Sequence, residues 1–239
     1  MRTQEGPGAP SSADAAGAEI PDIPLPFEKR LVPEAVYLDV LDATIEALDD
    51  AEVSYLFVGG IASAALGRPR LSVDVDIIVR PHDAPAVLEA LAGAGFRTQE
   101  TFPEWLFKGE RDGVVVDVIF VSSGGIYLDQ EMVEHARTVE FAGRKIRVAG
   151  PEDLIMMKAM AHSEPTPRYW FDALGIIARA DIDWDYLLQR ARLGPRRVLS
   201  LLFYAISKDL VVPERPINTL YALAMSGDTE VLDGDGTRP

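Results

Sequence analysis

The sequence contains no cysteine among its 239 residues. This absence excludes disulfide bridges and thiolate metal sites, and a cytoplasmic location is the expectation. The chain also lacks an uncharged apolar run of about 18 residues, which is the length that a membrane-spanning helix needs. We therefore expect no membrane partner.

Basic residues are scarce as well, because 23 lysines and arginines stand against 38 acids, for a formal net charge of -15. Residues 1–26 and residues 226–239 each carry -3, which leaves about -9 for the body of the chain. Phosphate binding depends on Lys and Arg, so this balance excludes a broad nucleic-acid face. One basic cluster remains at the junction of two expected helices: Arg190, Arg192, Arg196 and Arg197. The cluster is either a set of helix-end charges or a landing site for an anionic acceptor.

The composition divides the chain into four segments. Residues 1–26 are rich in Ala, Gly, Pro and Ser and have no apolar signal core, so we expect a disordered tail. Residues 226–239 predict a second, acidic disordered tail. Between them, residues 27–149 mix strand and helix patterns, whereas residues 150–225 show helical periodicity. The fold class expected is α/β (α+β), with an all-helical part following the α/β core.

Hydrophobic periodicity and turn residues predict the individual elements. Helices are expected over residues 33–51, 61–67, 83–95, 128–136, 151–163, 168–180, 183–192 and 195–210. Strands are expected within residues 55–60, 71–80, 104–123 and 138–150, where the third of these segments is a hairpin around Asp112-Gly113. Trp105, Trp170 and Trp184 lie in apolar patterns and are interpreted as core residues.

Three aspartates in apolar strands are the candidate catalytic and metal-binding residues. Asp74 and Asp76 are two positions apart in one expected strand, so they project from the same face. Asp117 lies in VVVDVIFV, a second apolar strand. If the two strands are neighbours, the three carboxylates converge, and two charges 4 Å apart repel by about 1 kcal/mol in water and about 4 at an effective dielectric near 20. Such a cluster needs a counter-charge, for which Mg²⁺ is the natural candidate.

A pair of glycines lies upstream of these aspartates. Gly59 and Gly60 occupy an expected strand-to-helix turn, where the lack of side chains lets backbone N–H groups approach a phosphate. The helix that follows directs its positive end to the same place. Phosphates, two metal ions and three acids in one corner suit an in-line displacement at phosphorus.

Together these motifs resemble the DNA polymerase beta-like nucleotidyltransferase superfamily. Its signature is G-G or G-S, then D-x-D or D-x-E, then a third acid on a later strand. The matching residues are Gly59, Gly60, Asp74, Asp76 and Asp117. Many members have Ser at the position of Gly60, so a hydroxyl contact to phosphate is lost there. The resemblance covers residues 55–121 and implies a small mixed β-sheet core backed by helices.

Within that superfamily the chain looks most like stand-alone bacterial nucleotidyltransferases, namely the abortive-infection toxin type and the minimal type. In the toxin type a helical part carries a Lys, then Arg or Asn, then Asp, and Lys158, Arg168 and Asp172 match it here. The resemblance implies that Lys158 contacts the triphosphate and that Asp172 orients the helical part. Arg70 and Ser72 occupy places where relatives often have Arg and Thr near phosphate.

The residues alone leave purely structural interpretations open for this helical part. Lys158 is alternatively a solvated helix charge. Arg168 and Asp172 are one helical turn apart, so they are alternatively a plain surface salt bridge.

The resemblance implies a Mg²⁺-dependent nucleotidyltransferase that moves a nucleoside monophosphate from an NTP, such as ATP, to an acceptor hydroxyl. Asp74, Asp76 and Asp117 would hold two Mg²⁺ ions, with Asp117 as general base. The acceptor is tRNA or another RNA, a protein or a small molecule, and a toxin–antitoxin role with a cognate antitoxin follows by analogy. The alternative is a non-catalytic nucleotide-binding or regulatory partner with the same fold.

Overall fold

The computed structural model describes residues 27–226, so the tails expected at residues 1–26 and 227–239 lie outside the described residues. Its strands form one seven-stranded mixed sheet in the order β3-β4-β5-β2-β1-β7-β6. The strands are β1 (Tyr55–Phe57), β2 (Asp74–Val79), β3 (Arg97–Phe102), β4 (Leu106–Arg111), β5 (Val114–Ile119), β6 (Arg137–Phe141) and β7 (Arg144–Val148). The expected mixed sheet backed by helices and followed by a helical part is confirmed.

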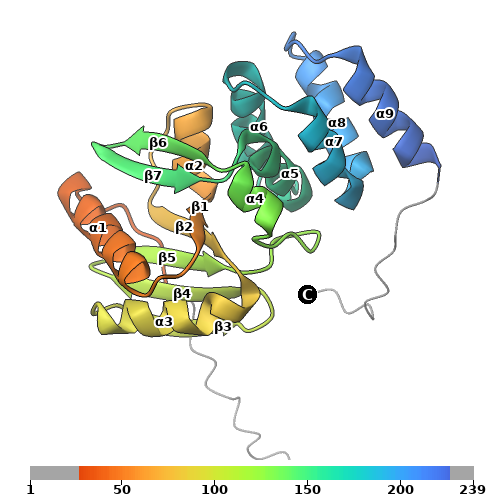
Figure 1. The fold of residues 1–239 in the computed structure, drawn as a ribbon. Coiled ribbons are helices and arrows are strands. Elements are labelled where there is room, and N and C mark those ends of the chain that lie inside the picture. The colour runs from red at the N-terminus through yellow and green to blue at the C-terminus, as the bar shows by residue number, and fades with distance from the viewer. Residues whose placement is uncertain (1–26, 227–239) are drawn as a thin grey trace, which may run out of the picture.

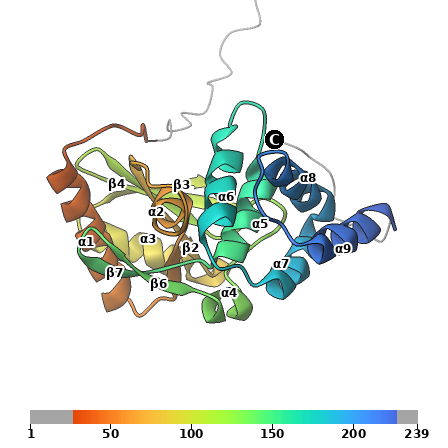
Figure 2. The same cartoon turned by 90° about the horizontal axis from the view of Figure 1, so that it is seen from above.

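Helices cover the sheet and then gather beside it (Figures 1 and 2). The α-helices are α1 (Glu34–Asp50), α2 (Gly59–Leu66), α3 (Ala84–Gly93), α4 (Gln130–Glu134), α5 (Pro151–Ala161), α6 (Arg168–Arg179), α7 (Trp184–Arg190), α8 (Pro195–Ile206) and α9 (Glu214–Met225), and short 3₁₀ turns are η1 (Pro81–Asp83) and η2 (Ala191–Leu193). Helix α3 packs on β3, β4 and β5, and α1 packs on α3. Helix α2 contacts β2 and also α5 and α6, so it links the sheet to the helical part.

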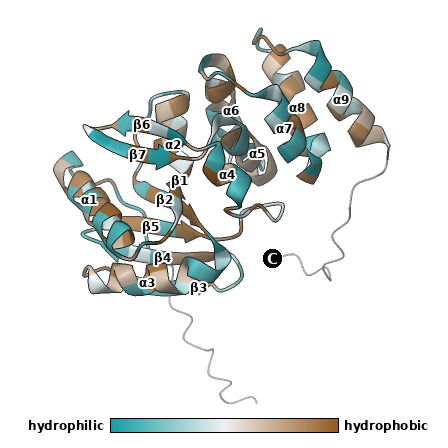
Figure 3. Ribbon diagram, viewed as in Figure 1, coloured by the Kyte–Doolittle hydropathy of each residue, from teal (hydrophilic) through white to brown (hydrophobic). Residues whose placement is uncertain are grey.

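The centre of the sheet is its most hydrophobic part. Strand β5 is coloured mainly hydrophobic in Figure 3, whereas β6 and β7 are largely hydrophilic. One core cluster joins both parts of the chain, since Leu41 of α1, Ile78 of β2, Leu154 of α5 and Leu202 of α8 belong to it. The sequence pattern changes between Val148, the end of β7, and Pro151, the start of α5. A division into two domains at that point stays a prediction.

The registers of three central strands place the candidate residues. Strands β2 and β5 are parallel neighbours, and Asp76 lies opposite Asp117. Strands β4 and β5 form the expected hairpin, whose turn residues Asp112 and Gly113 have φ of +54° and +84°. Positive φ at both positions is what a two-residue turn of this twist requires, and Asp-Gly supplies it.

Two described elements have no counterpart in the sequence prediction. Strand β3 is an edge strand of sequence RTQETF without a buried apolar face, so its pattern carries no strand signal. Helix α9 begins after Pro213 and has Pro216 in its first turn, where a missing N–H costs no helical hydrogen bond. Among residues 27–226, no helix is both long enough and apolar enough to cross a membrane.

Candidate active site

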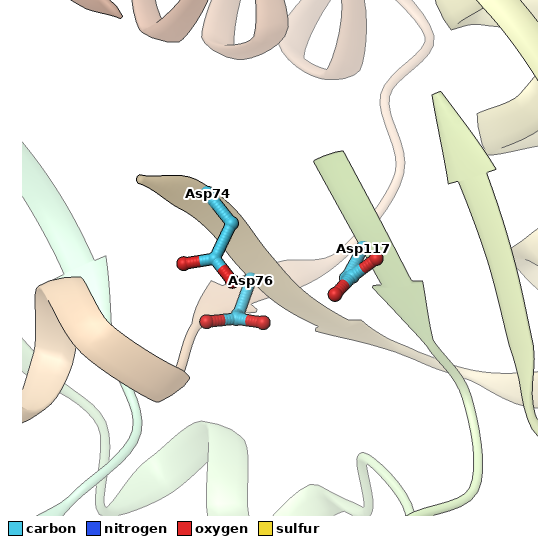
Figure 4. A group of neighbouring side chains, drawn as sticks. All are labelled: Asp74, Asp76 and Asp117. Carbon is cyan, nitrogen blue, oxygen red and sulfur yellow. The ribbon is translucent and has the colours of Figure 1, made fainter. Parts of the chain in front are cut away.

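The three aspartates meet at one place on the sheet (Figure 4). Asp74 and Asp76 project from the same face of β2, and Asp117 projects from the adjacent β5. One carboxylate oxygen from each residue lies within 4.8 Å of the other two. This convergence follows from the two-residue periodicity of a strand and from the β2–β5 register. The trio, called the acidic triad below, is a set of hard oxygen ligands of the kind that Mg²⁺ prefers.

Two lysines provide the counter-charge of the acidic triad in this structure. Lys29, in the segment before α1, donates to Asp74 and, at 2.7 Å, to Oδ2 of Asp117. Lys108 of β4 is buried and donates to Oδ1 of Asp117. Three carboxylates therefore face two ammonium groups, as the energetics of like charges require.

The carboxylates of the acidic triad titrate differently. Desolvation and the charge of Asp74 raise the pKa of Asp76 to about 6. Burial also raises the pKa of Asp74, but Lys29 and the Ser72 hydrogen bond outweigh it and hold that pKa below its ordinary value. Burial lowers the pKa of Lys29, yet the three carboxylates together raise it above the ordinary value. Lys29 is thus charged, and Asp76 is the carboxylate that a further cation would relieve most.

The glycine pair is fitted closely to the acidic triad. Gly59 begins α2 with a φ of +57°, and a Cβ on it would overlap the carboxylate of Asp76. The Gly60 N–H points at Oδ2 of Asp76, 3.3 Å away. A Cβ on Gly60 would overlap the hydroxyl of Ser72, which donates to Oδ1 of Asp74 at 2.7 Å. Glycine is favoured at position 59, where φ is positive and a Cβ would meet Asp76, whereas a side chain at position 60 would require Ser72 to move.

Two of the three residues that match the helical motif, Lys158 and Asp172, form a buried ion cluster with Arg70, which corrects two interpretations. Asp172 of α6 is fully buried and accepts two hydrogen bonds of 3.1 Å from Arg70, with Lys158 Nζ 3.4 Å away. A surface salt bridge between Arg168 and Asp172 is therefore wrong, because Asp172 points inward to the two other cations. Lys158 is buried too, and burial lowers its pKa, so a solvated helix charge is also wrong. Arg168 instead lies over the ring of Tyr169.

A cavity of about 610 Å³ connects these groups. One side carries the cationic residues Arg70, Lys158 and Arg168 with the glycine pair, and the acidic triad lies between this side and an apolar side. The apolar side is lined by Phe27, Phe102, Trp105, Leu106 and Ile119. A volume of this size suits a small-molecule or cofactor site.

Trp105 departs from its predicted place in the core. Its side chain is 40% exposed on the wall of the cavity, next to Phe102. Trp170 does pack inside the helical part, against His162 and Tyr204. Trp105 follows the end of β3 in a turn, where an apolar pattern of this length does not distinguish core from cavity wall.

The expected basic cluster divides into one buried arginine, Arg190, and three exposed ones, for which an anionic landing site stays a prediction. Arg190 is buried and paired with Asp129 and Asp153. Arg196 and Arg197 donate to the backbone carbonyls of Ala224 and His162. Neither a landing site nor plain helix-end charge describes Arg190, because its partners come from the loop before α4 and from α5.

Two site residues were missed by sequence reasoning. Lys108 had a usable signal, since a two-residue turn at Asp112-Gly113 fixes the hairpin register and places Lys108 opposite Asp117. Lys29 had none, because it lies in a segment without regular structure and reaches the site through tertiary packing.

The similarity of the chain to solved nucleotidyltransferases is distant. A lincomycin-bound lincosamide antibiotic adenylyltransferase, LnuA, is 17% identical, with 62% of this chain and 98% of that chain covered and a TM-score of 0.44. The antibiotic-resistance factor ANT(2'')-Ia is 17% identical, with coverages of 80% and 91% and a TM-score of 0.43. An antigenic nucleotidyltransferase-like protein from Paracoccidioides brasiliensis is 15% identical, with coverages of 76% and 91% and a TM-score of 0.43.

No curated protein matches the chain. A family model, described as "Uncharacterised nucleotidyltransferase", matches residues 34–210. That match spans the sheet, the acidic triad, the glycine pair and the helices through α8. The superfamily expected from the sequence is confirmed, and the chain belongs to this nucleotidyltransferase family.

Proposed function

We propose that the protein transfers a nucleoside monophosphate from an NTP to an acceptor hydroxyl and releases pyrophosphate. The observation that carries the proposal is the position of the acidic triad, between a cationic and an apolar side of one cavity. Phosphates need the cations, a divalent ion needs the carboxylates, and the acceptor needs the remaining space. Family membership supports this choice of reaction.

The acidic triad fits Mg²⁺ on chemical grounds. Its donors are all carboxylate oxygens within 4.8 Å of one another, and burial, followed by the charge of Asp74, raises the pKa of Asp76. Asp74, Asp76 and Asp117 would hold the ion or, as the superfamily resemblance implies, two ions. When bound, such ions supply Lewis-acid activation and neutralise charge on the transferred phosphoryl group.

The chain's own residues supply the other roles. Arg70, Lys158 and the N-terminus of α2 bind and orient the triphosphate, and Arg168 lines the same side. The acceptor oxygen attacks the α-phosphorus, the bond from that phosphorus to the α–β bridging oxygen breaks, and pyrophosphate leaves. Asp117 accepts the hydroxyl proton on Oδ2, which requires Lys29 to leave that oxygen, since Lys108 holds Oδ1.

The test is transfer from labelled NTPs by wild type and by Asp76→Asn, which keeps the shape and removes a ligand charge. We expect transfer and pyrophosphate release to fall about 10³-fold in Asp76→Asn, with circular dichroism and solubility unchanged. Ser63→Ala is a matched control, because Ser63 lies on α2 and only bonds the backbone of Gly59. Undiminished transfer by Asp76→Asn contradicts the assignment.

A second candidate is a non-catalytic nucleotide-binding protein. The position of Lys29 favours it, because its ammonium group lies among the carboxylates that a catalytic metal needs. An NTP-dependent rise in melting temperature, without pyrophosphate release in the presence of Mg²⁺ and acceptors, identifies this function. The expected toxin–antitoxin role with a cognate antitoxin rests on the superfamily resemblance and stays a prediction.

A further inference from the structure

The apolar side of the cavity carries two exposed aromatic rings. Phe102, the last residue of β3, and Trp105 are stacked with ring centroids 5.2 Å apart and an interplanar angle of 10°. Their side chains are 44% and 40% exposed, and both line the cavity. Large exposed aromatic surface in a cavity is unfavourable in water and marks a surface that a ligand covers.

The backbone holds this aromatic platform in place. The Trp105 N–H donates to the carbonyl of Phe102 at 3.0 Å and closes the turn between β3 and β4. The Trp105 carbonyl accepts hydrogen bonds from the N–H groups of Phe120 and Val121, at 3.1 and 3.4 Å. The rings are therefore organised before a ligand arrives, which reduces the entropy lost on binding.

The acidic triad lies between the platform and the residues proposed to bind the triphosphate, Arg70 and Lys158. In the sheet, β3 and β4 lie on one side of Asp117, and β2 with α2 lies on the other. Trp105, in the turn before β4, precedes Lys108, the partner of Asp117, by three residues, and three extended residues rise about 10 Å. A molecule that rests on the platform and reaches Asp117 must span about that length.

The charges of the cavity restrict what this molecule is. Among the described residues that line the cavity, the only carboxylates are those of the acidic triad. The lining cations are Lys29, Arg70, Lys108, Lys158 and Arg168. No carboxylate remains on the apolar side to pair with an ammonium group of an acceptor. A polycationic acceptor would therefore leave its charges unpaired beside Lys29 and Lys108.

We infer that Phe102 and Trp105 form the acceptor site and that the acceptor is a neutral small molecule. Such a molecule carries a flat ring or the apolar face of a sugar on the platform, and a hydroxyl about 10 Å away at Asp117. The inference rests on the proposed function and names its acceptor class. A long RNA is disfavoured because the net charge is -15 and because every lining cation lies with the acidic triad or with the triphosphate side.

The experiment offers three acceptor classes to the full-length protein with Mg²⁺ and each NTP. The probes are neutral aryl glycosides such as phenyl β-D-glucopyranoside, amino sugars with several ammonium groups, and a short single-stranded RNA with a free 3′ hydroxyl. Pyrophosphate release and product mass report transfer. Binding of the glycosides is measured separately, through quenching of tryptophan fluorescence in the presence of Mg²⁺ and a non-reactive NTP analogue.

Variants identify the platform. Trp105→Ala is expected to raise KM for the neutral glycoside about tenfold, and Trp105→Phe to restore most of the loss. The melting-temperature shift caused by Mg²⁺ and NTP is expected to stay unchanged in both variants. Phe203→Ala is the control, because Phe203 is 49% exposed on α8 and does not line the cavity.

The outcomes separate this inference from the proposed function. Transfer to amino sugars or RNA, without transfer to or Trp105-dependent binding of neutral glycosides, overturns the inference and leaves nucleotidyl transfer standing. An equal loss of the NTP shift in Trp105→Ala also overturns it, because the ring would then serve the nucleotide or the fold. Absence of any NTP shift and of pyrophosphate release overturns the proposed function and the inference with it.

Discussion

The molecule buries acidic residues at two places that differ in how their oxygens are used. In the Arg190 cluster, formed by Asp129, Asp153, Tyr186 and Arg190, the arginine lies within ion-pair distance of both carboxylates, although Oδ1 of Asp153 and Nε of Arg190 make no hydrogen bond to a described residue. Asp153 pairs with Arg190 at 2.7 Å and accepts from the Tyr186 hydroxyl at 2.8 Å. Asp129 accepts from the Met132 N–H at 2.8 Å and pairs with Arg190.

In the acidic triad, by contrast, Asp76 accepts only the Gly60 N–H among the described residues, at 3.3 Å. The remaining Asp76 oxygen faces a cavity of about 610 Å³. A shared cation joins elements together, and here it ties the loop before α4 to α5 and α7. Unpaired oxygens on a cavity are what a ligand site requires. Burial of acids alone does not distinguish the two roles, whereas their surroundings do, since Asp129 and Asp153 face Arg190 and Asp76 lines the cavity.

Removal of Arg190 tests whether the Arg190 cluster serves the stability of the fold. Arg190→Leu leaves Asp129 and Asp153 without their cation, and we expect it to lower the free energy of unfolding by about 3–5 kcal/mol. Urea denaturation measures this loss. Transfer activity per folded molecule is expected to stay near wild type, and an activity loss larger than the folded fraction explains would place Arg190 in the functional site.

The pH dependence of the free energy of unfolding also tests the Arg190 cluster, through Asp153. Desolvation raises the pKa of Asp153 to about 6 from 3.8, despite the charge of Arg190. The folded state thus holds a proton that the unfolded state releases between pH 4 and 6, so this group costs stability as pH rises through that window. Asp153→Asn removes the cost, and its stability relative to wild type should rise by about 2 kcal/mol from pH 4 to pH 6.5. A flat difference in denaturation midpoints would show that Arg190 compensates Asp153 fully.

Asp76→Asn tests the acidic triad, the second of the two places. Because the folded pKa of Asp76 is raised to about 6, its charge destabilises the folded state above that pH. At pH 8 we expect Asp76→Asn to raise the free energy of unfolding by about 2 kcal/mol while transfer is lost. Thermal and urea denaturation at pH 8 and pH 4.5 measure the change, which should be clearly smaller at the lower pH. A destabilised variant at pH 8 would mean that Asp76 serves the fold.

The smallest expected effect concerns Lys29. Lys29→Met removes a half-buried ammonium group from Asp74 and Asp117, so a divalent cation meets less competition. We expect Mn²⁺ or Mg²⁺ to bind about two- to fivefold more tightly, as calorimetry in the absence of nucleotide would report. Lys145→Met on β7 is the control, because Lys145 lies outside this cavity. Weaker metal binding by Lys29→Met would show that Lys29 holds the carboxylates in position.

Sequence reasoning reached the sheet and the acidic triad because local patterns carry them. The period-two spacing of Asp74 and Asp76, the apolar run around Asp117 and the turn residues at Asp112-Gly113 each act within a few neighbours. The alternative that pairs Asp172 with Arg168 is wrong, because the ion pair of Asp172 with Arg70 joins residues 102 positions apart. Lys29 contacts Asp117, which lies 88 positions away in the sequence, and no pattern in the segment around Lys29 predicts that contact. Contacts of this kind follow from tertiary packing, which a single sequence does not display.

The close fit of Gly60 and Ser72 couples the two positions. The Ser72 hydroxyl occupies the space where a side chain at position 60 would begin. A side chain introduced at position 60 would push this hydroxyl from its place and break its hydrogen bond to Asp74. The effects of substitutions at positions 60 and 72 are therefore expected to be non-additive.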